Sequence, residues 1–131
     1  MLIKKLEVEK IGNKLWRLTS PMEMKINGIL FTVPANFYTD GASNIRLLWN
    51  LCPPMSGATA EPSVLHDWLY SLDSPLMYSK IASDDIYLAA MEVMGVSYVR
   101  RNLIYQGVNL FGGSSYKAIH SVQKCTKDNL Y

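Results

Sequence analysis

Residues 22–33 read MEMKINGILFTV, and this stretch predicts an antiparallel β-hairpin. On each side of Asn27-Gly28, apolar side chains recur at every second position, which is typical of a strand with one buried face. Asn-Gly favours the type I′ turn of two-residue hairpins, because both central residues of that turn need positive φ. Pro34 has no N–H to donate, so we expect the pairing to end there.

Beyond the hairpin, the pattern changes from strands to helices. Apolar residues at helical spacing predict three helices, over residues 62–70, 78–94 and 96–111. Pro62 suits the first turn of the first helix, and Gly95 is placed to end the second. The chain is therefore expected to be an α+β protein, in which an N-terminal antiparallel hairpin sheet precedes a helical core.

The length of 131 residues predicts a single domain. Within it we expect four consecutive regions: a β region over 1–35, a long loop over 36–60, a helical core over 61–113 and a basic tail over 114–131. Long loops inside compact domains tend to be functional. The loop over 36–60 is therefore expected to contribute to a site.

The composition excludes several classes of protein. Apolar residues make up 49% of the chain and charged residues 18%, which suits a packed core and argues against disorder. A net charge of +2 is too small to predict a nucleic-acid partner. No apolar stretch is long enough for a membrane span or a signal peptide. The spacing of Cys52 and Cys125 does not indicate a disulfide framework, so a reducing compartment is expected.

A histidine and several carboxylates gather on the first two predicted helices. His66 and Tyr70 lie four residues apart and share a helix face, and Asp67 follows about 100° round from His66. Asp84 and Asp85 lie beside the apolar face of the second helix, so at least one of them needs a partner. If the two helices pack antiparallel, Asp84 can meet the imidazole of His66 and hold its tautomer. His66 is then a candidate general base.

A third carboxylate lies in the long loop. Asp40 is followed by Gly41 in a turn whose carbonyl groups can point outward. Asp40 and Asp67, together with loop carbonyls, make a set of hard oxygen ligands that suits Ca²⁺. Zinc is a poor alternative, because the two cysteines and two histidines of the chain lack the spacing of zinc ligands.

Each of these patterns also has a purely structural interpretation. The His-Asp pair can be an ordinary hydrogen-bonded pair on a helix. Ser83 or Asp84 can be the N-cap of a helix that starts later than expected, and Asp40-Gly41 can be a plain turn. Residues 61–95 carry one lysine against six acidic residues, which can simply be a solvated helix face.

Several motifs occur together in the order of a known family. In chain order they are Phe37-x-Thr39-Asp40-Gly41-Ala42-Ser43, Trp49, Leu65-His66-Asp67-Trp68-Leu69-Tyr70, Asp84-x-x-Tyr87-x-x-Ala90-Met91, Gly95, and Tyr105 through Phe111-Gly112. Over residues 20–113 the chain resembles the phage and prophage family catalogued as domain of unknown function thirteen-fifty-three. The resemblance implies a location in the host cytoplasm or the virion, and it implies no agreed function.

The same residues are similar to the secreted bacterial phospholipases of the A-two type. In those enzymes a Thr-Asp loop precedes His-Asp-x-x-Tyr on one helix and Asp-x-x-Phe/Tyr on an antiparallel second helix. The resemblance implies a phospholipase-like three-helix core. It also implies the following roles: His66 as the base that activates water, Asp84 as its orienting partner, Tyr70 as a supporting hydroxyl, and Asp67, Asp40 and the Gly41 carbonyl as calcium ligands.

Two hypotheses of different classes follow. The first is a calcium-dependent hydrolase of lipid or other esters, used in phage lysis or entry. The second is a non-enzymatic virion or assembly protein that keeps the motif as a structural network and binds other virion proteins. The first predicts that replacing His66 with alanine abolishes turnover while the fold remains. Co-purification with phage particles at a fixed ratio separates the two, because a virion component should show it.

Overall fold

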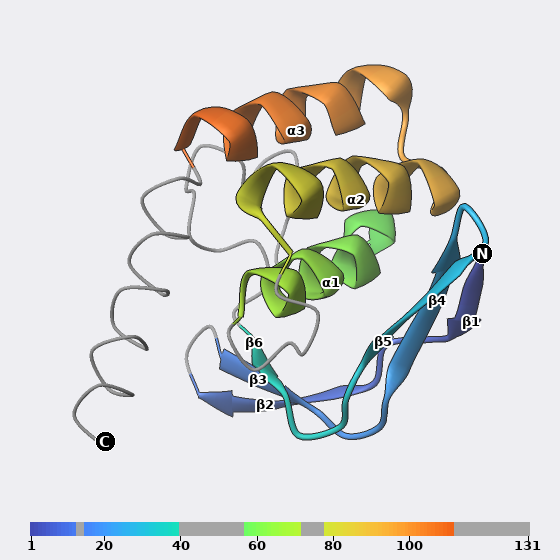
Figure 1. Cartoon of the computed structure of the whole chain (residues 1–131). Helices are drawn as coiled ribbons and strands as arrows, with labels where there is room; N and C mark the ends of the chain where they lie inside the picture. Colours follow the sequence, from blue (N-terminus) through green and yellow to red (C-terminus); the bar gives the residue numbers. More distant parts are fainter. Residues whose placement is uncertain (13–14, 40–56, 72–77, 112–131) are drawn as a thin grey trace, which may run out of the picture.

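The computed structural model describes residues 1–12, 15–39, 57–71 and 78–111, and within them six strands precede three helices (Figure 1). The predicted α+β class is confirmed. The strands form two small antiparallel sheets rather than one hairpin sheet. One sheet has the order β1-β4-β5, built from β1 (Leu2–Lys4), β4 (Met22–Ile26) and β5 (Ile29–Val33). The other has the order β2-β3-β6, built from β2 (Val8–Gly12), β3 (Leu15–Leu18) and β6 (Tyr38–Thr39).

The predicted hairpin is the pair β4–β5. Its register joins Met22 with Val33 at one end and Ile26 with Ile29 at the turn. The turn residue Asn27 has a φ of 51° and Gly28 a φ of 81°, which are the positive values that a type I′ turn requires. The local sequence therefore predicts the turn and the register of this hairpin.

The three predicted helices are all present, with shifted ends. They are α1 (Ala60–Tyr70), α2 (Lys80–Val93) and α3 (Tyr98–Phe111). α1 starts earlier than expected because it continues from the 3-10 turn Gly57–Thr59. Gly95 follows α2 with a φ of 80°, as expected for the residue after a helix end.

Side-chain caps explain where the other two helices begin. The Ser79 hydroxyl accepts a hydrogen bond from the Ala82 N–H at 3.1 Å, so α2 begins after Ser79. The alternative in which Ser83 or Asp84 caps a later helix is therefore wrong. Ser97 receives a similar bond from the Arg100 N–H at 3.4 Å, which delays the start of α3 from residue 96 to residue 98.

The structure describes only the two ends of the loop that we expected over 36–60. Tyr38 and Thr39 form β6, which pairs with Arg17 and Trp16 of β3. At the other end, α1 has already begun at Ala60. This two-residue strand is defined by a partner more than twenty positions away, so no local pattern announces it. Residues 40–56 lie outside the described residues.

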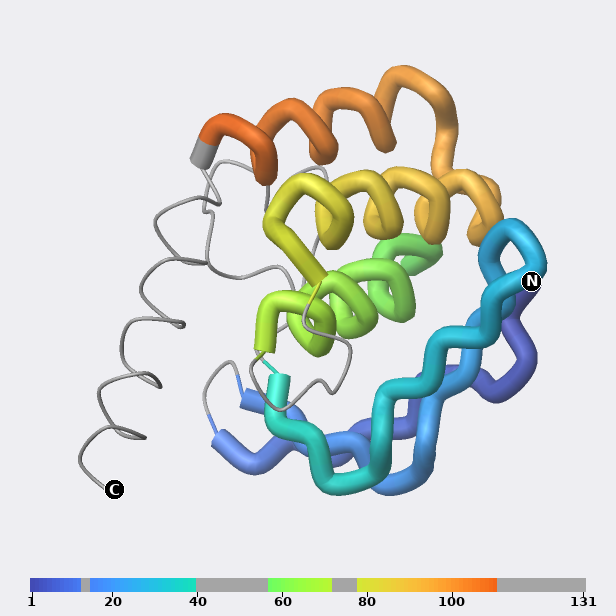
Figure 2. Tube along the Cα trace, viewed as in Figure 1, coloured from blue at the N-terminus to red at the C-terminus, as the bar shows by residue number. Residues whose placement is uncertain are grey.

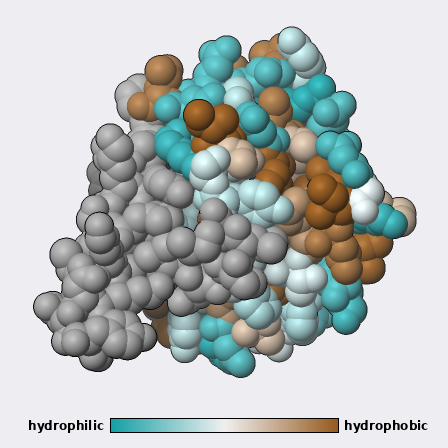
Figure 3. Space-filling view, in the orientation of Figure 1, coloured by the Kyte–Doolittle hydropathy of each residue, from teal (hydrophilic) through white to brown (hydrophobic). Residues whose placement is uncertain are grey.

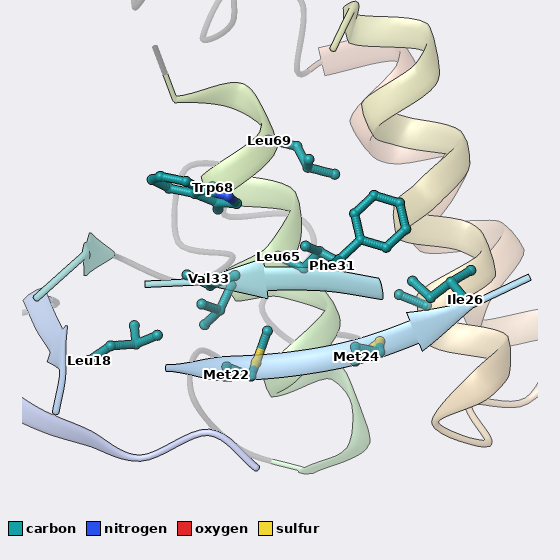
Figure 4. Packing of buried hydrophobic residues seen from close by; sticks show 11 residues of the cluster. Leu18, Met22, Met24, Ile26, Phe31, Val33, Leu65, Trp68 and Leu69 are labelled. Carbon is teal, nitrogen blue, oxygen red and sulfur yellow. The ribbon is translucent and has the colours of Figure 1, made fainter. Parts of the chain in front are cut away.

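The helices stack in order on the strands. α1 and α2 contact the sheet that contains β4 and β5, and α3 packs on α2 on the side away from the strands (Figures 1 and 2). An apolar cluster joins the strands to α1 and α2 (Figure 4); its buried members are Leu18, Met22, Met24, Ile26, Phe31, Val33, Val64, Leu65, Trp68, Leu69 and Ala90. A second cluster joins α2 to α3 through Tyr87, Met91, Val96, Ile104 and Val108.

Some large apolar side chains nevertheless reach the surface. Figure 3 shows hydrophobic and hydrophilic residues interspersed over the described part of one face. Ile81 of α2 and Val99 and Leu110 of α3 are among the exposed ones. In the part of the chain that the structure describes, no helix has both the length and the apolar character needed to cross a membrane.

Candidate functional site

α1 and α2 run antiparallel (Figure 2). They bring together three of the predicted site residues, His66, Tyr70 and Asp84. The His66 Nε2 lies 2.7 Å from Asp84 Oδ1, and the Tyr70 hydroxyl donates to the same oxygen at 2.5 Å. His66 and Tyr70 reach one carboxylate because they lie one helical turn apart on the same face of α1. The predicted contact between His66 and Asp84 is therefore present, and Tyr70 joins it.

Two aromatic rings contact the imidazole of His66. The His66 ring stacks on Tyr87 with a centroid distance of 4.5 Å and an interplanar angle of 21°, and it lies 4.2 Å from the Tyr70 ring. Tyr87 is itself fixed by a 2.9 Å hydrogen bond between its hydroxyl and that of Ser63. The His66 side chain remains 13% exposed. Among the described residues nothing hydrogen-bonds to its second nitrogen, Nδ1.

Lys80 is a member of the site that our sequence analysis missed. Its ammonium lies 2.6 Å from Asp84 Oδ2 and also donates to the carbonyl oxygens of Val108 and Asn109, at 3.2 and 3.4 Å. It thus links the start of α2 to the end of α3. The signal was available, since Lys80 and Asp84 are four residues apart, the spacing at which opposite charges meet on a helix.

The environment of Asp84 favours its charged form. The side chain is completely buried, which by itself raises the pKa of the carboxyl group. Hydrogen bonds from His66, Lys80 and Tyr70 outweigh burial and hold the pKa of Asp84 below its ordinary value. Asp84 is therefore a carboxylate at neutral pH, and it acts only as an acceptor.

The environment of His66 favours its neutral form. Burial lowers the pKa of the imidazole, and the positive charge of Lys80 lowers it further, whereas the bond to Asp84 works in the opposite direction without reversing the shift. A neutral imidazole next to an acceptor-only carboxylate carries its proton on the nitrogen that faces the carboxylate. The proton of His66 is therefore on Nε2, and Nδ1 keeps a lone pair.

Asp85, the neighbour of Asp84, lies outside this network. It is exposed and accepts a 2.6 Å hydrogen bond from the Tyr105 hydroxyl of α3. That bond raises the pKa of Tyr105, because the nearby carboxylate disfavours the phenolate. Of the two adjacent acidic residues, helix geometry assigns only Asp84 to the interior.

The structure places one of the three predicted calcium ligands. The half-buried Asp67 accepts a 2.6 Å hydrogen bond at Oδ2 from the hydroxyl of Thr39 in β6. Asp40 and Gly41 lie outside the described residues, although they follow Thr39 directly in the sequence. Within the described ranges, no group of three or more His, Cys, Asp or Glu residues is arranged to hold a metal ion.

A comparison with protein families identifies the chain. A family model described as a protein of unknown function, DUF1353, matches residues 16–108. The chain belongs to the DUF1353 family. The matched residues of this DUF1353 protein contain the whole network of His66, Tyr70, Lys80 and Asp84. No curated protein and no solved structure matches the chain.

Proposed function

We propose that this DUF1353 protein is a hydrolase in which His66 activates a water molecule. One observation carries the proposal: the Nε2 atom of His66 is held 2.7 Å from the buried carboxylate of Asp84, while Nδ1 has no hydrogen-bond partner among the described residues. A base needs this combination of a fixed ring and a free lone pair. The two flanking aromatic rings and the Tyr70 hydroxyl keep the pair in position.

The proposed reaction is the hydrolysis of an ester. Nδ1 of His66 takes a proton from water as the water oxygen bonds to the ester carbonyl carbon, and Asp84 stabilises the imidazolium that forms. When the carbon–oxygen bond to the alcohol breaks, Nδ1 returns the proton to the leaving oxygen. The products are a carboxylic acid and an alcohol, and His66 is again neutral.

Calcium is part of the proposal. Asp67 supplies a hard oxygen ligand in the described part of the chain, and Asp40 with the Gly41 carbonyl would supply the others. The bond between Thr39 and Asp67 supports this set, because Asp40 is the next residue after Thr39. A bound Ca²⁺ would polarise the ester carbonyl and stabilise its developing negative charge.

The proposed substrate is a lipid ester, and the proposed setting is a phage or prophage. The spacing of His66, Tyr70 and Asp84 is similar to that of the bacterial phospholipases of the A-two type. In that setting the protein would act during lysis or entry, from the host cytoplasm or from the virion.

The test is hydrolysis of phospholipid and short-chain ester substrates, with calcium or with a chelator. We expect turnover that requires calcium and that falls by at least about a hundredfold in His66→Ala, the lower end of what a general base contributes. His120, which lies outside the described residues, gives the matched control, because His120→Ala should leave turnover unchanged. Equal turnover in His66→Ala and the wild type would contradict the proposal.

One observation favours a second candidate, a non-enzymatic virion or assembly protein. Asp84 is fully buried and receives bonds from three donors, so the network can serve structure alone. This candidate predicts that the protein co-purifies with phage particles at a fixed ratio. It also predicts that His66→Ala changes stability and that no ester is hydrolysed by either form.

A further inference from the structure

Lys80, the first residue of α2, places a positive charge beside the buried carboxylate of Asp84. Its ammonium reaches Asp84 Oδ2 at 2.6 Å, and its side chain is 21% exposed while that of Asp84 is 0% exposed. At Asp84 the other two donors are the Tyr70 hydroxyl and the His66 Nε2, both of which act on Oδ1. Among the described residues, Lys80 is thus the donor to Oδ2, and His66 and Tyr70 are the donors to Oδ1.

We propose that Lys80 is the positioning residue that sets the tautomer of His66. Its ammonium, 2.6 Å from Oδ2, compensates the buried negative charge of Asp84, and so keeps this group a carboxylate. A carboxylate can only accept, so the Nε2 of His66 must donate to it and the lone pair stays on Nδ1. The inference deepens the proposed function, because it explains what makes Nδ1 available as a base.

The converse follows from the cost of burying a charge. Without Lys80, the interior would hold a carboxylate with no cation beside it, and such a group takes up a proton. If Asp84 holds that proton on Oδ1, the oxygen that faces His66, it donates to Nε2 and the neutral ring must carry its own hydrogen on Nδ1. If the proton passes to His66, both nitrogens carry hydrogen. In both cases Nδ1 loses its lone pair. Loss of Lys80 would therefore disable His66 as a base, although the His66 side chain itself is unchanged.

Lys80 also donates to the carbonyl oxygens of Val108 and Asn109, which lie in the last turn of α3. A purely structural role at this helix end would lower stability when Lys80 is removed, but it would not move a hydrogen between the ring nitrogens of His66. The two interpretations therefore differ in a spectroscopic property and not only in stability.

The experiment uses the full chain labelled with ¹⁵N-histidine and records the ring nitrogen resonances of His66 by NMR at neutral pH. The shift of each nitrogen shows whether it carries hydrogen. His120→Gln assigns the signals. We expect hydrogen on Nε2 alone in the wild type and in Lys80→Arg, and hydrogen on Nδ1 in Lys80→Met. A folded Lys80→Met protein with the wild-type pattern would overturn the inference.

Two controls complete the design. Lys4 forms an exposed ion pair with Glu23 at 3.8 Å, so Lys4→Met should leave the His66 signals unchanged. If Lys80→Met does not fold, the double variant Lys80→Met/Asp84→Asn should, because it removes the charge that needs compensation. If the double variant does not fold while Asp84→Asn alone does, the role of Lys80 is to stabilise the end of α3. That outcome would overturn the inference.

None of these measurements requires turnover. A protein that hydrolyses no ester can still show the expected change at Nδ1, so failure of the proposed function and failure of this inference are distinguishable. If the protein does hydrolyse esters, Lys80→Met should lower kcat with little change in KM, and Lys80→Arg should restore most of kcat.

Discussion

Two neighbouring residues of α1 are buried in two different environments. Leu69 packs in the apolar cluster against the strands, whereas Tyr70 donates to the buried carboxylate of Asp84. Apolar contacts are not directional, so the stability of the apolar cluster depends on how completely its side chains fill the space. The second environment contains a charge, and it is stable only while specific donors surround that charge. The same helix thus contributes to an apolar core that close packing stabilises and to a polar site that hydrogen bonds and an ion pair stabilise.

The largest expected effect comes from removing the charge at the centre of the site. Asp84→Ala leaves the Lys80 ammonium without its carboxylate, and we expect a loss of about 3–5 kcal/mol in the free energy of unfolding. Denaturant titration measures it. Asp85→Ala is the matched control, because Asp85 is exposed and its loss removes only the bond from Tyr105, which should cost no more than about 1.5 kcal/mol. Equal losses for these adjacent positions would refute the distinction between the two faces of α2.

A smaller effect is expected from removing one donor. Tyr70→Phe keeps the ring against His66 but deletes the hydroxyl that donates to Asp84, so we expect a loss of about 1.5–3 kcal/mol, as for a hydrogen bond to a charged group. Thermal unfolding of Tyr98→Phe gives the comparison, since Tyr98 is 70% exposed and should be nearly neutral. Equal stability of Tyr70→Phe and the wild type would show that the network does not need this donor.

The finest distinction between the two environments is their response to pH. His66 has a lowered pKa in the folded protein, so below about pH 6.5 the unfolded chain binds a proton that the folded chain resists. The contribution of His66 to the free energy of unfolding is therefore fully present above that pH. It falls as the pH decreases, by at most about 1.4 kcal/mol per pH unit for one group. The lowered pKa of Asp84 adds a further loss only below about pH 4.

Two variants distinguish the pH dependence due to His66 from the stability of the apolar cluster, in unfolding curves recorded from pH 8 to pH 4. His66→Gln should remove the loss that begins near pH 6.5, because glutamine does not titrate. Leu69→Ala should lower stability by about 2–5 kcal/mol at every pH and leave the shape of the profile unchanged. A His66→Gln profile with the wild-type slope between pH 6.5 and pH 5 would refute the assigned protonation of His66.

Much of the site was predictable because it depends on two local regularities. His66 and Tyr70 share a face of α1 by helical spacing, and Asp84 lies beside the apolar face of α2. Once the two helices pack antiparallel, the contact follows. Lys80 could have been found in the same way from its spacing to Asp84. The calcium ligands are different, since Asp40 and Gly41 belong to a segment outside the described residues and only Asp67 is placed.

The sequence by itself determined the elements whose cause is local: the Asn27-Gly28 hairpin, the three amphipathic helices and the glycine that ends α2. Only the tertiary structure decided which groups far apart in the sequence are buried together. β6 exists because β3 lies beside it, and Asp84 stays charged because α1 and its own helix deliver three donors to one buried carboxylate. Propensity acts over a few residues, whereas pairing and burial depend on segments far apart in the chain.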